Sequence, residues 1–248
     1  MDGDILTLST THDRVQQVLR RIPPHVTVVA AAKGASSEQL TEAVEAGIRI
    51  VGQNYMADVR RMRGAITAPV LWHFIGRLQT HSVRPANLRL LDAVQSVDSF
   101  ALAERISVAS GRLGQEMQVL IEVNSGREAQ KSGVLPQDTE ALVRQIATLR
   151  HLKVTGLMTL GPHSATQAGY RPCFAETRQL FEHIRNLDIS GVQLAHLSMG
   201  MSDSYETAIE EGATMVRLGT VLFGARKPDT PSCGKDSSQG LPSLQATR

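Results

Sequence analysis

The chain has 248 residues, which is enough for one large domain or two small ones with a substantial core. Hydrophobic residues make up 42% and charged residues 20%, as in soluble globular proteins, and no apolar run approaches the roughly 20 residues that a membrane helix needs. The net charge is only +2, and the segment from Ala225 to Arg248 supplies it, so the remainder is nearly neutral. This near-neutral charge argues against nucleic-acid binding, and the lack of a long apolar run argues against membrane insertion.

The N-terminal sequence and the two cysteines bear on location. The acidic start, Met1-Asp2-Gly3-Asp4, is unlike a secretory or organellar signal. Cys173 and Cys233 are too few, and too differently placed, for a disulfide framework or a zinc site. Asp and Glu residues are not grouped as metal ligands either. We therefore expect a cytoplasmic protein without a metal site.

Short apolar runs alternate with stretches of helical periodicity along most of the chain. A first helix is predicted over roughly Thr11 to Arg21. Eight strands are predicted at Val26–Lys33, Ile48–Asn54, Val70–Gly76, Ala93–Val97, Met117–Asn124, Val154–Leu160, Gln193–Gly200 and Met215–Gly224. The helices between them include Ser37–Ala46, Ser99–Gly111, Asp138–Leu149, Tyr170–Leu187 and Ser202–Glu211. This alternation favours a (β/α)8 TIM barrel over a doubly wound sheet.

The end of the predicted barrel departs from the usual pattern. No helix is expected after the eighth strand, and the N-terminal helix could cover the gap. Residues 1–227 are therefore interpreted as one barrel domain with an N-terminal helix. The tail from Pro228 to Arg248 is rich in Pro, Gly, Ser and Gln, and is predicted to be disordered.

Lys33 ends the apolar run that begins at Val26. A lysine at the end of a buried strand carries a large desolvation penalty unless its amine is paired or neutral. A Schiff base with an aldehyde such as pyridoxal 5'-phosphate (PLP) is one solution. A side chain that extends beyond the strand into water is the other.

Barrel sites form at the C-terminal ends of the strands, and several polar residues fall there. Ser198, Gly200 and Ser202 lie where the seventh strand turns into a helix with the capping box Asp203-x-x-Glu206, and Gly219 and Thr220 lie in the eighth strand. These segments suit a phosphate, although they could be turn and cap residues only. Arg217, inside an apolar strand, requires a buried partner, either a salt bridge or a pyridine nitrogen. His73 could be a core histidine.

Seven motifs now form an ordered set: Val28-Val29-Ala30-Ala31-Ala32-Lys33, Gly52-Gln53-Asn54-Tyr55, Trp72-His73-Phe74-Ile75-Gly76, Lys131-Ser132-Gly133, Gly156-Leu157-Met158, Leu197-Ser198-Met199-Gly200-Met201-Ser202, and Met215-Val216-Arg217-Leu218-Gly219-Thr220 followed by Phe223-Gly224-Ala225-Arg226. Over about residues 10 to 227 the chain resembles the PLP homeostasis protein family, the YggS/PROSC group, which is related to the N-terminal barrel of alanine racemase. The resemblance implies a PLP-bound, single-domain (β/α)8 barrel.

The resemblance also assigns roles to individual residues. Lys33 matches the lysine that forms the Schiff base, and Arg217 matches the arginine that faces the pyridine nitrogen. Phosphate contacts match Ser198, Gly219 and Thr220, with Met201 and Ser202 beside them. Asn54, His73 and Met158 match positions near the cofactor ring.

Three functions remain open from the sequence. An arginine beside the ring nitrogen disfavours its protonation and weakens the ring as an electron sink, which favours a reversible PLP carrier. The second base of alanine racemase comes from an additional β-rich domain, for which this chain leaves no room. A racemase-like enzyme would use Lys33 with His73 or Tyr55 as the opposite base. A protein that acts through partners without PLP is the third. For the carrier we expect a monomer whose partners are PLP and PLP-dependent apoenzymes or free amino acids.

Two departures from the family pattern lie near the predicted mouth. Gln53 replaces a common glutamate, and Arg77 and the segment 79–82 replace a proline and a Gln-Ser-Asn-Lys sequence. We expect PLP binding to survive these changes, while regulation or cofactor transfer could differ. Lys131 is the natural substitute lysine to examine if Lys33 is not the attachment point.

Overall fold

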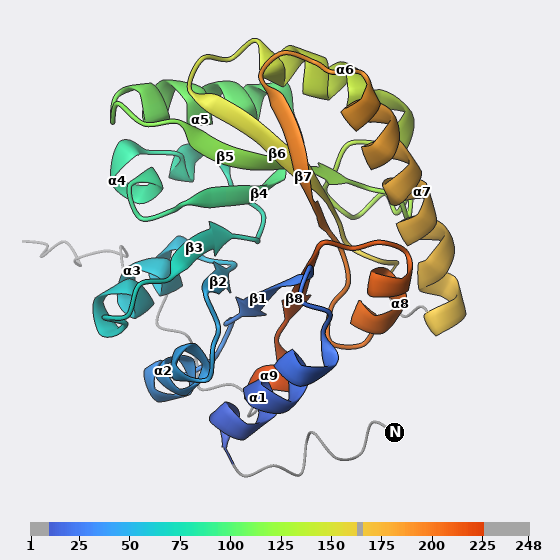
Figure 1. The fold of residues 1–248 in the computed structure, drawn as a ribbon. Helices are drawn as coiled ribbons and strands as arrows, with labels where there is room; N and C mark the ends of the chain where they lie inside the picture. Colours follow the sequence, from blue (N-terminus) through green and yellow to red (C-terminus); the bar gives the residue numbers. More distant parts are fainter. Residues whose placement is uncertain (1–9, 163–165, 226–248) are drawn as a thin grey trace, which may run out of the picture.

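The computed structural model describes residues 10–162 and 166–225, and it contains a closed barrel of eight parallel strands (Figure 1). The strands are β1 (Thr27–Ala31), β2 (Ile50–Gln53), β3 (Leu71–Phe74), β4 (Ala93–Val97), β5 (Met117–Val123), β6 (Leu152–Thr159), β7 (Val192–Ser198) and β8 (Met215–Leu218). They follow one another around the barrel in sequence order, and β1 closes it on β8. The predicted TIM barrel is thus confirmed. The predicted tail, 228–248, lies outside the described residues.

Alternating side chains of the strands fill two separate layers of the core. Val28 and Ala30 point outward into the large cluster between the sheet and the helices. Val29, between them, points inward and packs with Ile50 and Met215. The barrel interior therefore has an apolar part on the β8–β1–β2 side, as expected for a packed barrel.

Helices cover the outside of the barrel. They are α1 (Thr11–Arg21), α2 (Ser37–Glu45), α3 (Met56–Ala65), α4 (Pro85–Leu88), α5 (Phe100–Gly111), α6 (Pro136–Ala147), α7 (Gln167–Asn186), α8 (Tyr205–Glu210) and α9 (Thr220–Phe223), with a 3-10 turn, η1, at Thr80–Ser82. The first helix has its predicted bounds. Strand ends differ from prediction by up to six residues, because an apolar run does not show where the hydrogen-bond ladder stops.

The end of the barrel corrects two predictions. A last helix exists, because the four residues of α9 follow β8, and α1 lies beside α9 (Figure 1). The Arg14 Nε donates to the Leu222 carbonyl over 2.8 Å, so α1 covers this part of the barrel as predicted. Gly219 and Thr220 lie outside β8, since the Ser202 hydroxyl takes the N–H groups of Gly219 and Val221 in place of a strand partner.

The predicted capping box at Asp203 is also wrong. Helix α8 begins only at Tyr205, and its N-cap Ser204 makes no side-chain cap bond. The Ser204 hydroxyl instead accepts from the Met201 N–H over 3.1 Å, and the Asp203 carboxylate accepts from the Tyr170 hydroxyl over 3.0 Å. The Ser204 hydroxyl and the Asp203 carboxylate therefore bond groups outside α8 and do not cap the helix.

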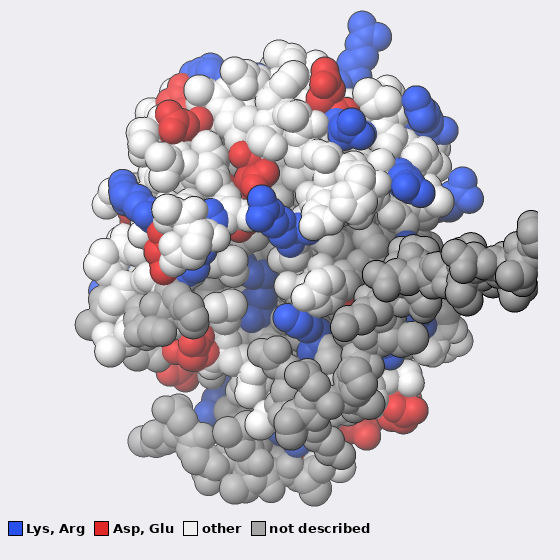
Figure 2. All heavy atoms as spheres, turned by 180° about the vertical axis from the view of Figure 1, so that it is seen from behind, with Lys and Arg blue, Asp and Glu red and all other residues white. Residues whose placement is uncertain are grey.

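The surface carries both signs of charge. On the face drawn in Figure 2, Lys and Arg side chains are interspersed with Asp and Glu. Arg60, Arg61 and Arg63 lie on α3; Arg61 pairs with Asp58 at 2.9 Å, and Arg63 donates to the Leu90 carbonyl at 3.0 Å. Within residues 10–162 and 166–225 no helix is both long and apolar enough to cross a membrane.

Candidate functional site

The ten residues that the sequence singles out divide into a rim set and an interior set. Because all strands are parallel, residues that follow them gather at one end of the barrel, the mouth. At this rim lie two exposed residues and four half-buried ones: Lys33, Thr220, Asn54, Met201, Ser202 and Gly219. The remaining four are buried in the barrel wall or interior: His73, Met158, Ser198 and Arg217.

Lys33 is exposed and lies in a turn, two residues beyond the end of β1. The strand stops at Ala31, and Gly34 adopts a positive φ of 79°, which turns the chain towards α2. The expectation of a lysine at a buried strand end is therefore wrong, and the alternative of an amine that extends past the strand holds. Its Nζ lies 5.4 Å from the centre of the Tyr55 ring, which places an accessible amine beside an exposed aromatic.

The rim next to Lys33 contains a cradle of donors. The Ser202 hydroxyl accepts from the backbone N–H of Gly219 at 3.1 Å and of Val221 at 3.3 Å. Neither the N–H nor the hydroxyl of Thr220 has a hydrogen-bond partner among the described residues. Because the N–H groups of Gly219 and Val221 already donate to Ser202, the Thr220 N–H and the hydroxyls of Thr220 and Ser202 are the donors that suit an anion such as a phosphate.

Close backbone packing keeps the cradle beside the Lys33 turn. A Cβ on Gly219 would lie 3.2 Å from the Ala31 carbonyl, so the ends of β8 and β1 approach each other closely. Gly200, with a φ of 90°, is needed on the other side, since a Cβ there would lie 2.5 Å from that of Ala208 in α8. The lysine and the cradle thus belong to neighbouring strand ends.

Arg217 is held inside the barrel by three neutral oxygens. Its Nη1 donates to the Ser198 carbonyl at 2.9 Å and to the Ser198 hydroxyl at 2.7 Å, and its Nη2 donates to the Thr159 carbonyl at 2.8 Å. Its Nε has no partner within the described residues. Of the five guanidinium N–H groups, the Nε–H and one Nη2–H therefore remain for a ligand atom.

Buried charge perturbs Arg217 and Glu122 in opposite directions. Burial lowers the pKa of Arg217 to about 10, and the charge of Glu122 partly counteracts this. Burial, followed by repulsion from Asp98, raises the pKa of Glu122 to about 7, against the attraction of Arg217 and Arg77. Glu122 makes no ion pair with Arg217 within 4.0 Å, so it acts as a nearby counter-charge without direct contact.

Ser198 and His73 belong to the interior and not to the rim. The Ser198 hydroxyl is fully buried between Arg217 and Gln95, and Gln95 also contacts His73 Nδ1 at 2.8 Å. The predicted phosphate contact of Ser198 and the predicted ring contact of His73 therefore have no support in this geometry. Met158 is also buried, in register with Ser198 of β7 and Glu122 of β5.

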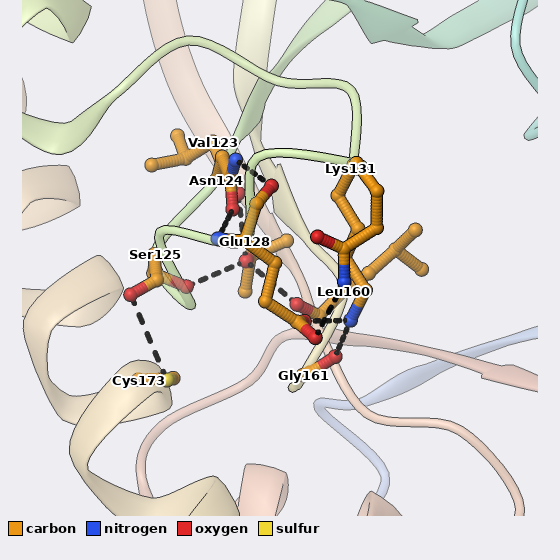
Figure 3. A network of polar contacts seen from close by, with 10 residues as sticks. Val123, Asn124, Ser125, Glu128, Lys131, Leu160, Gly161 and Cys173 are labelled. Atoms are coloured by element: carbon orange, nitrogen blue, oxygen red, sulfur yellow. Dashed lines mark hydrogen bonds and ion pairs between the residues drawn. The ribbon is translucent and has the colours of Figure 1, made fainter. Parts of the chain in front are cut away.

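Lys131 is engaged elsewhere (Figure 3). Its Nζ donates to the Gly161 carbonyl at 2.8 Å and pairs with the Glu128 carboxylate. Asn124 secures the same loop, because its side chain bonds both the N–H and the carbonyl of Glu128. Lys131 therefore ties the loop after β5 to the segment after β6, and its amine is less available than that of Lys33.

Sequence comparison now supplies the family. The profile of the family "Alanine racemase, N-terminal domain" matches residues 6–227. A protein of Aquifex aeolicus named pyridoxal phosphate homeostasis protein is 36% identical over 89% of this chain and 97% of its own length. A protein of the same name from Pseudomonas aeruginosa is 37% identical over 87% and 91%. The chain belongs to the pyridoxal phosphate homeostasis protein family.

Solved structures agree with this assignment. PipY of Synechococcus elongatus PCC7942 without PLP has 31% identity and a TM-score of 0.81, and the match covers 87% of this chain and 100% of PipY. The structure of PipY with PLP bound has 29% identity and a TM-score of 0.79 over the same shares. An alanine racemase of Clostridium difficile, at 13% identity and a TM-score of 0.72, shares the fold over 57% of its length.

The departures from the homeostasis family pattern have different surroundings. Gln53 is fully buried at the end of β2; its Nε2 lies 3.5 Å from the Ala32 carbonyl, and its Oε1 has no partner in the described structure. Arg77 is exposed after β3 and contributes positive potential at Glu122. The first change therefore affects the support of the Lys33 turn, and the second affects the charge of the mouth.

Two site residues escaped the sequence reasoning. Gln95 and Glu122 both interrupt apolar strands, in Ala-Val-Gln-Ser-Val and Met-Gln-Val-Leu-Ile-Glu-Val. The reasoning that singled out Arg217, a polar group in a buried strand, would have found them as well. In the described part of the chain no three His, Cys, Asp or Glu residues are grouped as metal ligands.

Proposed function

We propose that this protein binds PLP at the barrel mouth, holds it reversibly as a Schiff base on Lys33, and thereby serves PLP homeostasis without robust catalysis. The observation that carries the proposal is the position of the accessible Lys33 amine beside the donor cradle of Ser202, Gly219 and Thr220. Family membership and the PLP-bound structure of PipY support it.

The residues present fit the chemical groups of this cofactor. The cradle would hold the phosphate through the hydroxyls of Ser202 and Thr220 and the N–H of Thr220, while Ser202 keeps the N–H groups of Gly219 and Val221. Arg217 would present its unpartnered Nε to the ring nitrogen. Asn54 and Met201, both half-buried at the rim, would border the ring and the cradle. Ser198 would act through Arg217 and not on the phosphate, and Met158 and His73 would lie behind the site.

The electrostatics favour a carrier over a catalyst. When bound, PLP supplies an aldehyde for a lysine amine and, with a protonated ring nitrogen, an electron sink. Arg217 disfavours that protonation, because even with its pKa lowered to about 10 the guanidinium stays charged at neutral pH. A buried cation therefore limits carbanion chemistry at this site.

The two candidates for a second racemase base also favour a carrier over a catalyst. His73, one candidate for a second racemase base, is buried and bonded to Gln95, and burial lowers its pKa to about 4. Tyr55 is the remaining candidate, since it is exposed beside Lys33. A slow racemase therefore depends on Tyr55 alone as the group opposite Lys33.

We extend the proposal to the organisation of the protein. Residues 1–227 act as one PLP-binding domain, and the protein works as a cytoplasmic monomer. Support comes from the rim, to which residues of a single chain contribute the amine, the cradle and the arginine. PLP-dependent apoenzymes or free amino acids would accept the cofactor.

A spectroscopic titration tests the function. PLP is added to the purified protein, and the visible Schiff-base absorbance is followed before and after a panel of L- and D-amino acids. A carrier shows a saturable band that amino acids leave unchanged or deplete by removing PLP, with no exchange of their α-protons in D2O. Loss of optical purity of an added amino acid would make the protein a racemase, and absence of the band would contradict PLP binding through a lysine.

A further inference from the structure

A continuous chain of hydrogen bonds crosses the barrel interior from β3 to β8. His73 Nδ1 lies 2.8 Å from Gln95 Nε2, and the Gln95 Oε1 lies 2.7 Å from the Ser198 hydroxyl. The Ser198 hydroxyl lies in turn 2.7 Å from Arg217 Nη1. All four residues are buried, with exposures of 0–6%. We call these residues the His73–Arg217 chain.

The direction of every bond in this chain follows from its charged end. A guanidinium only donates, so the Ser198 oxygen accepts from Arg217 and its own proton is directed to Gln95 Oε1. The Gln95 amide then donates to His73 Nδ1, which must be an unprotonated acceptor. His73 is therefore neutral with its proton on Nε2, in agreement with a pKa that burial, and secondarily the charge of His196, lowers to about 4.

The His73 end of the His73–Arg217 chain lies towards the N-terminal ends of the strands, opposite the mouth. His73 lines a cavity of about 260 Å³ together with residues at the N-terminal ends of β3, β4 and β5, among them Asp92 and Glu116. Arg217, at the near end, bonds the carbonyl of Thr159, the last residue of β6. The His73–Arg217 chain thus connects the N-terminal end of the barrel to the mouth.

A polar chain of this kind is expensive as mere core filling. Apolar side chains ordinarily fill barrel interiors, as Val29, Ile50 and Met215 do here, and Met215 Sδ contacts Gln95 Nε2 at 3.3 Å. Burying polar groups is unfavourable unless each finds its partner. Here each link has one orientation, and the last link fixes the guanidinium plane and leaves Nε unpartnered.

We infer that Gln95 and His73 are positioning residues, which act through Ser198 to hold Arg217 in the orientation that presents its Nε to the ligand. The inference rests on the proposed function for the identity of that ligand, and on the hydrogen bonds alone for the placement of Arg217. Without Gln95, the Ser198 hydroxyl loses its acceptor and rotates, so the Arg217 side chain gains freedom. Ligand affinity then falls although neither Gln95 nor His73 belongs to the rim.

The substitution Gln95→Met tests this inference, because Met has a similar length and cannot make either bond. In the unliganded protein, the Arg217 Nε–H resonance is observed by 15N NMR, and we expect faster hydrogen exchange in the variant. PLP affinity, from the absorbance titration, should fall about tenfold, the value of one net hydrogen bond. Thr155→Val is the matched control; it removes a buried strand hydroxyl that donates to the Val119 carbonyl, and should change neither readout.

A double-mutant cycle separates positioning from general damage. In an Arg217→Met background, Gln95→Met should have no further effect on PLP affinity. An unchanged Arg217 Nε–H exchange rate in Gln95→Met, or an undiminished loss of affinity in the Arg217→Met background, would overturn the inference. If the exchange rate responds while the wild-type protein binds no PLP, the positioning chain stands and the proposed function fails.

Discussion

Lys33 and Arg217 are the two cations of the site, and their surroundings are opposite. Lys33 follows β1, is exposed, and makes no hydrogen bond or ion pair with another described residue, while its Nζ lies 5.4 Å from the centre of the Tyr55 ring. Arg217 lies within β8, is 3% exposed, and donates three hydrogen bonds to oxygens of Ser198 and Thr159. The difference indicates a division of labour: Lys33 is free to react and release, while Arg217 is fixed and cannot move with the ligand.

The largest expected effect is on PLP attachment at Lys33, with little change in the stability of the fold. Lys33→Ala should abolish the visible PLP absorbance, because the proposed attachment point is lost. Its free energy of unfolding should stay within about 1 kcal/mol of wild type, since the side chain is exposed, forms no hydrogen bond in the described residues, and loses only its interaction with the Tyr55 ring. The checks are a PLP titration and urea unfolding. Lys131→Ala is the control and should keep the band; loss of the band there instead would reverse the assignment.

A substitution of Arg217, in contrast to one of Lys33, should reduce the stability of the fold. Arg217→Met leaves the Ser198 carbonyl, the Ser198 hydroxyl and the Thr159 carbonyl without their donor, and leaves Glu122 without its counter-charge. We expect a loss of about 3 kcal/mol in the free energy of unfolding, together with weaker PLP binding. Urea unfolding measures the first quantity. A variant as stable as wild type would show that the guanidinium contributes nothing to the fold.

Glu122, the carboxylate whose charge acts on Arg217, should make the free energy of unfolding depend on pH. Glu122 titrates at a pKa of about 7 in the folded protein, against 4.5 for an ordinary carboxyl, so its contribution to stability is complete below pH 4.5 and is lost as the pH rises through 7. Glu122→Gln removes this loss. Relative to wild type, the variant should therefore gain up to about 3 kcal/mol between pH 4.5 and pH 8.

Urea unfolding of both proteins at pH 5 and pH 8 measures that gain. The low pKa of His73 acts in the opposite sense, because stability falls as the pH drops from 6.5 towards 4. Both proteins retain His73, so the difference between them isolates Glu122. A stability difference that does not change with pH would contradict a Glu122 carboxyl that is protonated in the folded protein near neutrality.

The smallest effect concerns the aromatic neighbour of Lys33. Tyr55→Ala removes the ring that faces the ammonium at 5.4 Å, an interaction worth about 0.5–1 kcal/mol at exposed sites. PLP affinity should change by roughly two- to fivefold, and Tyr55→Phe, which keeps the ring, should bind like wild type. Abolition of α-proton exchange by Tyr55→Phe, in a protein that catalyses such exchange, would instead identify Tyr55 as a base.

The fold could be predicted from the sequence more completely than the site. Alternating apolar runs and helical periods predicted the eight strands, because each strand must bury one face against a helix. The run from Met215 to Gly224 is apolar except for Arg217 and Thr220, so it could not show that β8 stops at Leu218 and that the Ser202 hydroxyl accepts from the N–H groups that follow. Such tertiary hydrogen bonds have no local signature.

The same limit explains the reassigned residues. Ser198 and His73 occupy strands that end at the mouth, and residue type alone could not distinguish a side chain that faces a ligand from one that bonds Gln95. Lys33 was expected at a buried strand end because the apolar run continues to Ala32, whereas the ladder ends one residue earlier, at Ala31. Where a strand ends decides which side chains reach the rim.

Reductive trapping identifies the lysine to which PLP is attached. The PLP-loaded protein is treated with borohydride, digested, and mapped by mass spectrometry, with unfolded protein as a control for non-specific labelling. We expect a single stoichiometric phosphopyridoxyl group on Lys33 in the folded protein. Labelling of Lys131 or Lys153 in preference to Lys33, or labelling no more selective than in the unfolded control, would contradict it.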